Sequence, residues 1–566
     1  MPTSIFELFN QLKRGREGRS TQAVAHRVRR GRTAKSITSQ PMVNGVGSAQ
    51  KGLQLASGNF LIDGRLIRDP DEPIWDVDRD NIGFQTKAQG FFWLDHLAAN
   101  GSADCMAVAR IWFGTWLEQF GNGDNLAWTP ELAGARIIRL INHAIILLGN
   151  TTKRNQKDFF TSVSHHARFL KKRWQYAPEG LPRFQALVGY VYSALALGEF
   201  KKDLKPALHA LGKECENYID ADGGIPTRNP EELLDILTLL VWVVQGMTSA
   251  SLTPDRALLD AIDRMAPAIR TLRSGDGKLA EFYGGRAATR ARIGQVLMDS
   301  GTRSTSTLDN VMGYSRIAKA KSLLIVDTGD RPNIAADGAG SECALAFELS
   351  SARHPIFQSM GTGQDLSDQR RKASYRADGF TVATLQPFLP DEAGRTPKLS
   401  TMMAPDTKVT ILQSAAMGDG TAMLMAAHTG YRQGAGLTYR RKLKLTRNGR
   451  VLTGTDRFYC DRKRDRAVLD AATKHQSEHR ISIAAKFHIA PDVNAELDLG
   501  GAAVSLQLPD NTVWIFKASG GAISLQDSAY YSSERLKPRA TKQIVVTFDV
   551  VNYEGEITWM LTCLDG

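Results

Sequence analysis

The stretch TRSTSTLD, residues 302–309, separates two parts of the sequence that differ in hydrophobic period. Before it, apolar residues recur at helical spacing, as they do in the segment 104–120. After it come short segments in which apolar and polar residues alternate, with turn signals such as Asn448-Gly449 between them. This change predicts a helical first half followed by a second half of antiparallel strands.

The first half predicts a series of amphipathic helices joined by short links. Some begin with a capping oxygen, a proline and a carboxylate, as in Thr129-Pro130-Glu131 and Asn229-Pro230-Glu231. Short links between helices of similar length imply antiparallel hairpins, which close into a toroid or extend as a solenoid. The expected helices are 104–120, 131–148, 158–174, 181–199, 204–219, 231–247 and 255–272.

The second half predicts short strands that pack as a β-sandwich. The expected domains are a basic N-terminal arm and loop (1–60), a helical domain (61–305) and a strand domain (306–566). The expected strands are 322–327, 344–350, 408–416, 421–428, 437–445, 451–458, 482–489, 512–517 and 543–551.

Composition narrows the class of protein. The 566 residues are 42% hydrophobic and 23% charged, which is typical of a globular chain with more than one domain. The 71 Lys and Arg against 59 Asp and Glu give a net charge of +12, which suits a polyanionic partner. The 5 cysteines form no CxxC pair, which argues against a disulfide scaffold or a zinc ribbon and suits a reducing compartment.

Membrane and targeting signals are weak. The apolar run 233–244 is interrupted by Asp235 and is shorter than a membrane span, so it is expected to be a buried helix. In a secretory signal, basic residues come first and an apolar run follows them, and the first residues of this chain do not have this order. We therefore expect a cytoplasmic protein, with the periplasm or cell envelope as the alternative. The Arg-rich segment 13–35 is interpreted as a solvated helix or arm rather than a lipid- or phosphate-binding segment.

A set of strings spans most of the chain from about residue 100 onward. The strings are WTPELAGARIIRLIN (128–142), EGLPRFQALVGYVYSALALG (179–198), DADGGIPTRNPEELLDIL (220–237), GYSRIAKAKSLLIVDTG (313–329), CALAFELS (343–350), AAHTGY (426–431) and KFHIAPDV (486–493). In this order, they resemble the heparinase II/III family of polysaccharide lyases, particularly its forms without a signal peptide.

The resemblance implies an α/α toroid followed by an antiparallel β-sandwich domain, with no cofactor. It also implies cleavage of an acidic, uronate-containing polysaccharide by β-elimination. In that reaction the enzyme neutralises the uronate carboxylate, a base removes the C5 proton, and an acid protonates the leaving oxygen.

When the family's catalytic positions are matched to this sequence, most of them carry a different residue. The place of a Gly-Asn-His string is taken by Gly180-Leu181-Pro182, and the place of a Tyr-His pair by Glu232 and Leu233. In the strand domain, Ser341 stands where relatives carry a His before CALAFELS. The resemblance therefore leaves two interpretations: a lyase whose catalytic residues have moved, or a degenerate relative that binds glycan without cleaving it.

Other residues are candidates for the missing roles. His428 and Tyr431 lie together near a predicted strand end and could supply a base and an acid, and a loop histidine is an equal alternative. If they act in this way, Tyr431→Phe and His428→Ala would each abolish lyase activity without disturbing the fold.

The helical half offers two further pairs. Arg183 could clamp a uronate with Tyr190 as acid or base, since residues seven apart can share a helix face, although a tyrosine packed on the core is the simpler interpretation. Asn142 and His143 superficially match a carboxylate-neutralising pair, but their apolar helix favours a packing role.

No metal site is expected, because the histidines lack carboxylates at ligand spacing. The residues considered are His165, His166, His475, His479 and His488, the last with Ala490 where relatives often carry a second His.

Two other classes are considered. A toroid glycosidase would need two carboxylates flanking the scissile bond, and Asp220, Asp222 and Glu232 are the acids to test, although turn and capping roles explain each of them. A nucleic-acid binder could use the Arg-rich arm and would lose affinity steeply with salt, but nucleic acid is an unlikely partner here.

Overall fold

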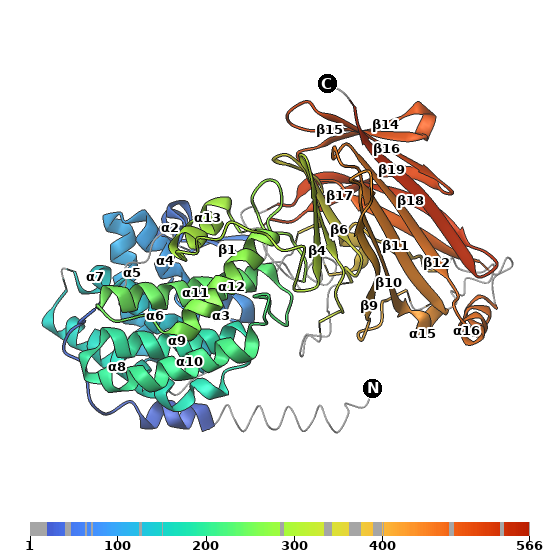
Figure 1. The fold of residues 1–566 in the computed structure, drawn as a ribbon. Helices are drawn as coiled ribbons and strands as arrows, with labels where there is room; N and C mark the ends of the chain where they lie inside the picture. Colours follow the sequence, from blue (N-terminus) through green and yellow to red (C-terminus); the bar gives the residue numbers. More distant parts are fainter. Residues whose placement is uncertain are drawn as a thin grey trace. The chain divides into compact units, whose positions relative to one another are not determined.

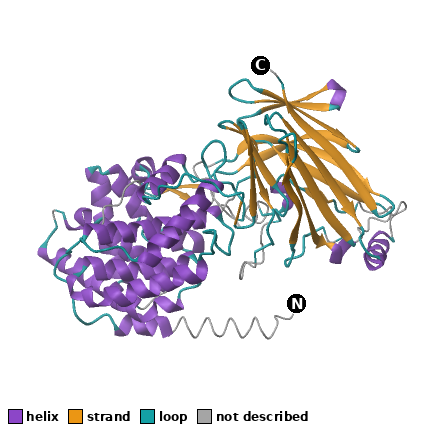
Figure 2. Cartoon of the chain, in the orientation of Figure 1, coloured by secondary structure: helices purple, strands orange, loops and turns teal. Residues whose placement is uncertain are grey.

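The structure is a computed structural model. It describes residues 20–564 apart from 40–46, 63–64, 70–71, 124–126, 150, 284–287, 333–341, 362–374, 389–398, 400, 475–479 and 533–536. The chain divides into two compact units, and each is described by itself. The helical unit comprises Met1–Ala221, Leu234–Ala266 and Ala291–Arg303, and the strand unit comprises Asp222–Leu233, Pro267–Arg290 and Ser304–Gly566 (Figures 1 and 2).

This division differs from the predicted boundary between residues 305 and 306. Two segments from the helical part of the sequence fold with the strands. The reason is visible at Arg228, which donates to the carbonyl oxygens of Met312 (2.6 Å) and Gly313 (2.9 Å). Arg228 also forms a buried ion pair with Asp327. Such contacts join residues about a hundred positions apart, which local sequence pattern does not reveal.

The helices that the periodicity predicts are present in the first part of the chain. The predicted helix 131–148 is the exception, since it is divided at His143, whose backbone leaves helical geometry. Helices also form where none was predicted, at Ala49–Ala56, Ile82–Gln89, Phe92–Asn100 and Arg290–Asp299, and the first of these lies in the stretch 1–60 that was expected to be arm and loop. The helices are α2 (Ala49–Ala56), α3 (Ile82–Gln89), α4 (Phe92–Asn100), α5 (Ala103–Phe120), α6 (Pro130–Asn142), α7 (Ala144–Leu148), α8 (Lys153–Arg173), α9 (Leu181–Ala196), α10 (Leu204–Tyr218), α11 (Pro230–Ser249), α12 (Arg256–Thr271) and α13 (Arg290–Asp299).

The described part of the basic arm is held by backbone contacts. Residues 20–27 are helical, and Arg168 on α8 donates to the carbonyl oxygens of Val28 and Arg29, both at 2.7 Å. The side chains of Arg27 and Arg30 stay exposed. The backbone of the arm is therefore bound by Arg168, while the side chains of Arg27 and Arg30 face the solvent.

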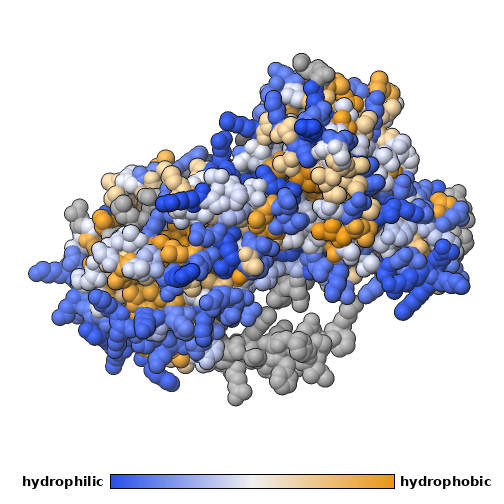
Figure 3. Space-filling model, viewed as in Figure 1, coloured by the Kyte–Doolittle hydropathy of each residue, from blue (hydrophilic) through white to orange (hydrophobic). Residues whose placement is uncertain are grey.

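Helix α11 is long and apolar enough to cross a membrane by composition alone, but 67% of its apolar window is buried inside the protein. Leu233, Leu237 and Leu240 are each 0% exposed. The prediction of a buried helix at 233–244 therefore holds. On the face shown in Figure 3, hydrophilic side chains cover most of the surface of each unit, and apolar residues appear in separate patches.

Helices α6 and α9 are in close contact through two glycines. A Cβ added to Gly189 on α9 would lie 2.6 Å from the Cα of Gly134 on α6, and one added to Gly134 would overlap the carbonyl oxygen of Gln185. Real Cβ atoms do not approach so closely, so the crossing requires glycine at both positions.

Gly134→Ala is expected to lower the free energy of unfolding by roughly 1–3 kcal/mol, because the methyl group overpacks the α6–α9 crossing. Gly114→Ala on α5 is the matched control, since no atom lies within 4 Å of its added Cβ. There alanine should be neutral or stabilising by about 0.5–1 kcal/mol. Denaturant unfolding of both variants measures the difference, and equal effects would contradict the packing argument.

The strand unit holds antiparallel sheets of five, eight and four strands. The five-stranded sheet runs β3 (Asn310–Val311), β4 (Tyr314–Lys319), β5 (Ser322–Asp327), β6 (Phe347–Ser351), β7 (His354–Phe357). The eight-stranded sheet runs β14 (Asn494–Asp498), β15 (Ala503–Gln507), β16 (Val513–Ser519), β19 (Glu554–Cys563), β12 (Val451–Tyr459), β11 (Leu437–Leu445), β10 (Ala422–Tyr431), β9 (Val409–Ala416). The four-stranded sheet runs β17 (Ala522–Tyr530), β18 (Arg539–Val550), β13 (Ile481–His488), β8 (Ala383–Leu385).

Alternation along these strands buries one face of the eight-stranded sheet. Strand β19 alternates between exposed and buried residues along most of its length, and β11 and β12 show the same period. On the buried side, the rings of Phe516 and Trp559 contact those of Phe347 on β6 and Phe487 on β13. Each predicted strand is present within a few residues of its expected bounds.

Candidate functional site

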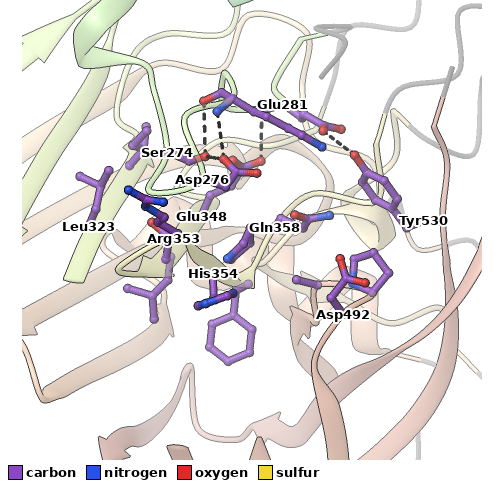
Figure 4. Close-up of a pocket in the computed structure, with 18 of the residues that line it drawn as sticks. Ser274, Asp276, Glu281, Leu323, Glu348, Arg353, His354, Gln358, Asp492 and Tyr530 are labelled. Carbon is purple, nitrogen blue, oxygen red and sulfur yellow. Dashed lines mark hydrogen bonds between the residues drawn. The ribbon is translucent and has the colours of Figure 1, made fainter. Parts of the chain in front are cut away.

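A cavity of about 190 Å³ lies within the strand unit (Figure 4). Its walls come from β5 and β6, from the hairpin around residue 276 and from the segments that carry Asp492 and Tyr530. The apolar wall includes Leu323, Ile325 and Phe357. Two buried carboxylates, Glu281 and Glu348, also line it.

The hairpin is held against the five-stranded sheet by close backbone approach. Arg273 and Leu279 form its bridge, and the amide of Gly275 donates to Ser350 Oγ at 2.9 Å. A Cβ added to Gly275 would overlap the carbonyl oxygen of Ala352, so only glycine fits there. This contact brings Glu281, which follows the hairpin, to the side of Glu348 on β6.

The two carboxylates have few but well-formed hydrogen bonds. Glu348 Oε1 accepts from Ser359 Oγ (2.8 Å), from the Ser359 amide (3.2 Å) and from the Glu281 amide (3.1 Å). Glu281 Oε1 accepts from the hydroxyl of Tyr530 at 2.7 Å (Figure 4). Glu281 and Glu348 are only 7% and 6% exposed.

Burial raises the pKa of both acids. The pKa of Glu348 rises from 4.5 to about 7, because burial outweighs the hydrogen bonds from Ser359 and the Glu281 amide. The pKa of Glu281 lies well above its ordinary value, first through burial and then through the nearby charge of Glu348. Burial and the Glu281 carboxylate likewise raise the pKa of Tyr530. Raised pKa values of this kind, beside a cavity, are typical of functional sites and also occur in structural networks.

Glu348→Gln should flatten the dependence of stability on pH. The native pKa of Glu348 is raised, so its contribution is fully present below the unfolded pKa of 4.5 and is lost as the pH rises through about 7. The gap between these pKa values corresponds to roughly 3 kcal/mol. Thermal melts from pH 5 to pH 8 should show the wild type losing stability relative to Glu348→Gln. A difference between the two proteins that does not change with pH would contradict this account.

The structure places His428 and Tyr431 in the core of the strand unit. Each is 1% exposed, and their rings contact each other with centroids 5.5 Å apart. Burial lowers the pKa of His428 to about 3 and raises the pKa of Tyr431. The structure thus brings the two rings together, but it encloses them. His428→Ala would also leave a void in the core. The stability of this variant must therefore be measured together with its activity, because it was expected to leave the fold undisturbed.

Arg183 and Tyr190 share α9, and no described hydrogen bond joins them. Arg183 donates to the carbonyl oxygen of Ala177 (3.1 Å) and lies 3.7 Å from Glu214. Tyr190 is 5% exposed, and burial raises its pKa to about 12. The guanidinium is therefore engaged within the helical unit, and the phenol is packed in its core.

Asn142 and His143 lie at the end of α6. His143 Nε2 is 2.8 Å from Asp95 Oδ1, and the other oxygen of Asp95 accepts from Arg139 Nε at 2.7 Å. Arg139 and His143 hold the pKa of Asp95 below its usual value, although burial opposes them. This arrangement ties α6 to α4 and supports the packing role expected for the pair. Both pairs of candidates belong to the helical unit, whereas His428 and Tyr431 belong to the strand unit.

Of the residues that the resemblance places at the family's catalytic positions, Leu181, Pro182 and Leu233 are apolar, whereas Glu232 carries a carboxylate. Leu181 and Pro182 are partly buried in the first turn of α9, and Leu233 is fully buried in α11. Ser341 lies outside the described residues. The Glu232 amide donates to Asn229 Oδ1, which is one of the two bonds of the expected capping box, and the Glu232 carboxylate accepts from Thr227 Oγ1 at 2.7 Å.

The histidines considered as metal ligands have other contacts. His165 stacks on Trp128 with ring centroids 4.0 Å apart, and His488 Nδ1 lies 3.1 Å from the carbonyl oxygen of Gln358. His475 and His479 lie outside the described residues. Within the described part of the chain, no three His, Cys, Asp or Glu side chains are grouped so that they could hold a metal ion.

Glu281, Glu348 and Tyr530 were missed by the sequence interpretation. Glu348 did carry a signal, because it is the one charged residue in the apolar string CALAFELS, and a charge on a buried strand needs a partner or a role. Glu281 and Tyr530 carried none, since they are 249 residues apart and meet only in the folded chain.

Residues 302–560, which make up most of the strand unit, match the family described as Heparinase II/III-like, C-terminal. The fold of the chain is similar to that of heparinase III, with a TM-score of 0.69 at 11% identity over 98% of this chain and 91% of that one. It is also similar to heparan sulfate lyase HepC from Pedobacter heparinus, with a TM-score of 0.56 at 13% identity over 97% and 88%. The expected heparinase II/III resemblance and the α/α toroid followed by a β-sandwich domain are confirmed.

A curated relative is similar over nearly the whole chain. It is FtsZ-localized protein C from Caulobacter vibrioides, 26% identical over 536 residues, which cover 91% of this chain and 88% of the relative. Its name describes a place in the cell and no reaction.

Proposed function

We propose that this protein is a heparinase-fold binding protein that recognises an acidic glycan without cleaving it by β-elimination. One observation carries the proposal: residues 181 and 182, where the resemblance places the groups that neutralise the uronate carboxylate, have no hydrogen-bonding side chain. These residues are Leu181 and Pro182, and Leu233 is buried. The candidate replacements, His428 and Tyr431, are enclosed in the core, where a polymer would not reach them.

The net charge supports the choice of an anionic ligand. A charge of +12 attracts polyanions over a range that salt shortens, so binding should weaken as ionic strength rises. A binding function also removes the need for an acid and a base with pKa values near neutrality.

An ultraviolet elimination assay on heparan, chondroitin, hyaluronan, alginate and pectate tests the proposal. We expect no rise in absorbance from the protein, with a heparinase as positive control, and retention of at least one of these polymers at low salt in the same preparation. Rising absorbance would contradict the proposal and favour the interpretation of the protein as a lyase. Tyr431→Phe, with its folding checked, would then test whether Tyr431 is the catalytic acid. Absence of both cleavage and retention would contradict glycan recognition itself.

A second proposal concerns location, and similarity to FtsZ-localized protein C over 91% of the chain favours it. We expect a fluorescent fusion of the full chain to gather where FtsZ gathers in its own cell and to disperse when FtsZ is depleted. The same fluorescent protein alone is the control for position. A fusion that keeps its distribution after FtsZ is depleted would contradict this proposal, and it would leave glycan binding to the assay above.

A further inference from the structure

The cavity in the strand unit holds two acids without a compensating cation. Glu281 and Glu348 form no ion pair with any residue that the structure describes, although both are more than nine-tenths buried. Buried carboxylates are usually paired, coordinated to a metal or protonated, because an isolated charge is costly away from water. These two acids therefore have room for a partner that the chain itself does not supply.

Both carboxylates can accept further hydrogen bonds. The hydrogen bonds that described residues donate to each carboxylate all reach Oε1, and Oε2 of Glu281 and of Glu348 accepts none from them. Neither Oε2 is among the polar atoms that are both buried and without a hydrogen bond, and both residues line the cavity. A ligand in the cavity would therefore find two carboxyl groups that can accept further hydrogen bonds.

The basic residues nearby are engaged or lie in solvent. Arg539 pairs with Asp492, and its Nη1 is 3.2 Å from Asp492 Oδ2. His354 lies 3.7 Å from Asp510. Lys278 and Arg353 are exposed, where water and salt screen their charge. The inner end of the cavity is therefore acidic, and its walls at Leu323 and Phe357 are apolar.

The volume limits the size of the ligand. A cavity of about 150 Å³ accommodates one benzene molecule in another protein, so the 190 Å³ here suits a single six-membered ring with a substituent. It excludes a chain of sugars. The cavity is thus a different kind of site from a surface that would bind a polymer.

We propose that this cavity binds a compact organic ammonium ion, no larger than one six-membered ring, whose N–H groups donate to Glu281 and Glu348. An ammonium group supplies both the charge and the donors that the two carboxylates lack, and the ring fills the apolar part of the cavity. The inference is independent of the proposed glycan and FtsZ functions.

Calorimetric titration of the full chain near neutral pH tests this inference with matched probes. Glucosamine and cyclohexylamine each carry an amine, and glucose and cyclohexanol are their uncharged counterparts. We expect at least one amine to bind, and at least tenfold more tightly than its counterpart. If glucosamine alone binds, the cavity prefers a hydroxylated ring. If cyclohexylamine alone binds, the cavity prefers an apolar ring. Equal binding of amines and counterparts, or no binding of either amine at 10 mM, would overturn the proposal.

Variants locate the site. Glu348→Gln and Glu281→Gln should each weaken amine binding at least tenfold, since each replaces a carboxyl group that can ionise beside the ammonium with a neutral amide of the same shape. Glu496→Gln, at an exposed position on β14, is the control and should leave binding unchanged. Equal loss in the control, or full affinity in both cavity variants with native melting behaviour, would show that the amine binds elsewhere. Having both cavity variants keeps the test valid if one fails to fold.

Discussion

The strand unit depends on one buried ion pair, between Arg441 on β11 and Asp456 on β12. Asp456 also accepts from the hydroxyl of Tyr439 (2.6 Å) and from Trp559 Nε1 (2.8 Å). Arg441 donates to the carbonyl oxygens of Leu345 (2.8 Å) and Thr381 (2.7 Å), which precede strands of the five- and four-stranded sheets. A single guanidinium therefore connects three sheets, and loss of either charge would leave the other unpaired at a cost of about 3–5 kcal/mol.

The cavity acids show the opposite arrangement. Arg441 and Asp456 satisfy each other within the core, whereas Glu281 and Glu348 line a space that the chain does not fill. Both pairs are almost fully buried, so burial alone does not separate a structural charge from a functional one. The structural pair finds its charged partner within the chain, whereas the two cavity acids have no charged partner among its described residues.

The chain keeps the fold of the lyases, but the resemblance places Leu181, Pro182 and Leu233 at three of the family's polar catalytic positions. This combination is consistent with the general rule that a fold hosts many functions and that activity belongs to the site. The glycan-binding proposal retains the surface charge of the protein and needs no proton transfer. His428 and Tyr431 illustrate the point, because their residue types suit catalysis and their enclosed position does not.

Local periodicity was enough to predict many of the helices and strands in their order, and even the bounds of β5 and β11, because the hydrophobic period of a segment depends only on its own residues. It did not predict α2, α3, α4 and α13, or strands such as β14 and β19. The recognised strings extended this to the family fold. Contacts between distant residues decided the rest: the break at His143 beside Asp95, and the cavity assembled from Glu281 and Tyr530. Burial and charge pairing depend on residues that meet only in three dimensions, so no local pattern could have predicted which acid would face a cavity.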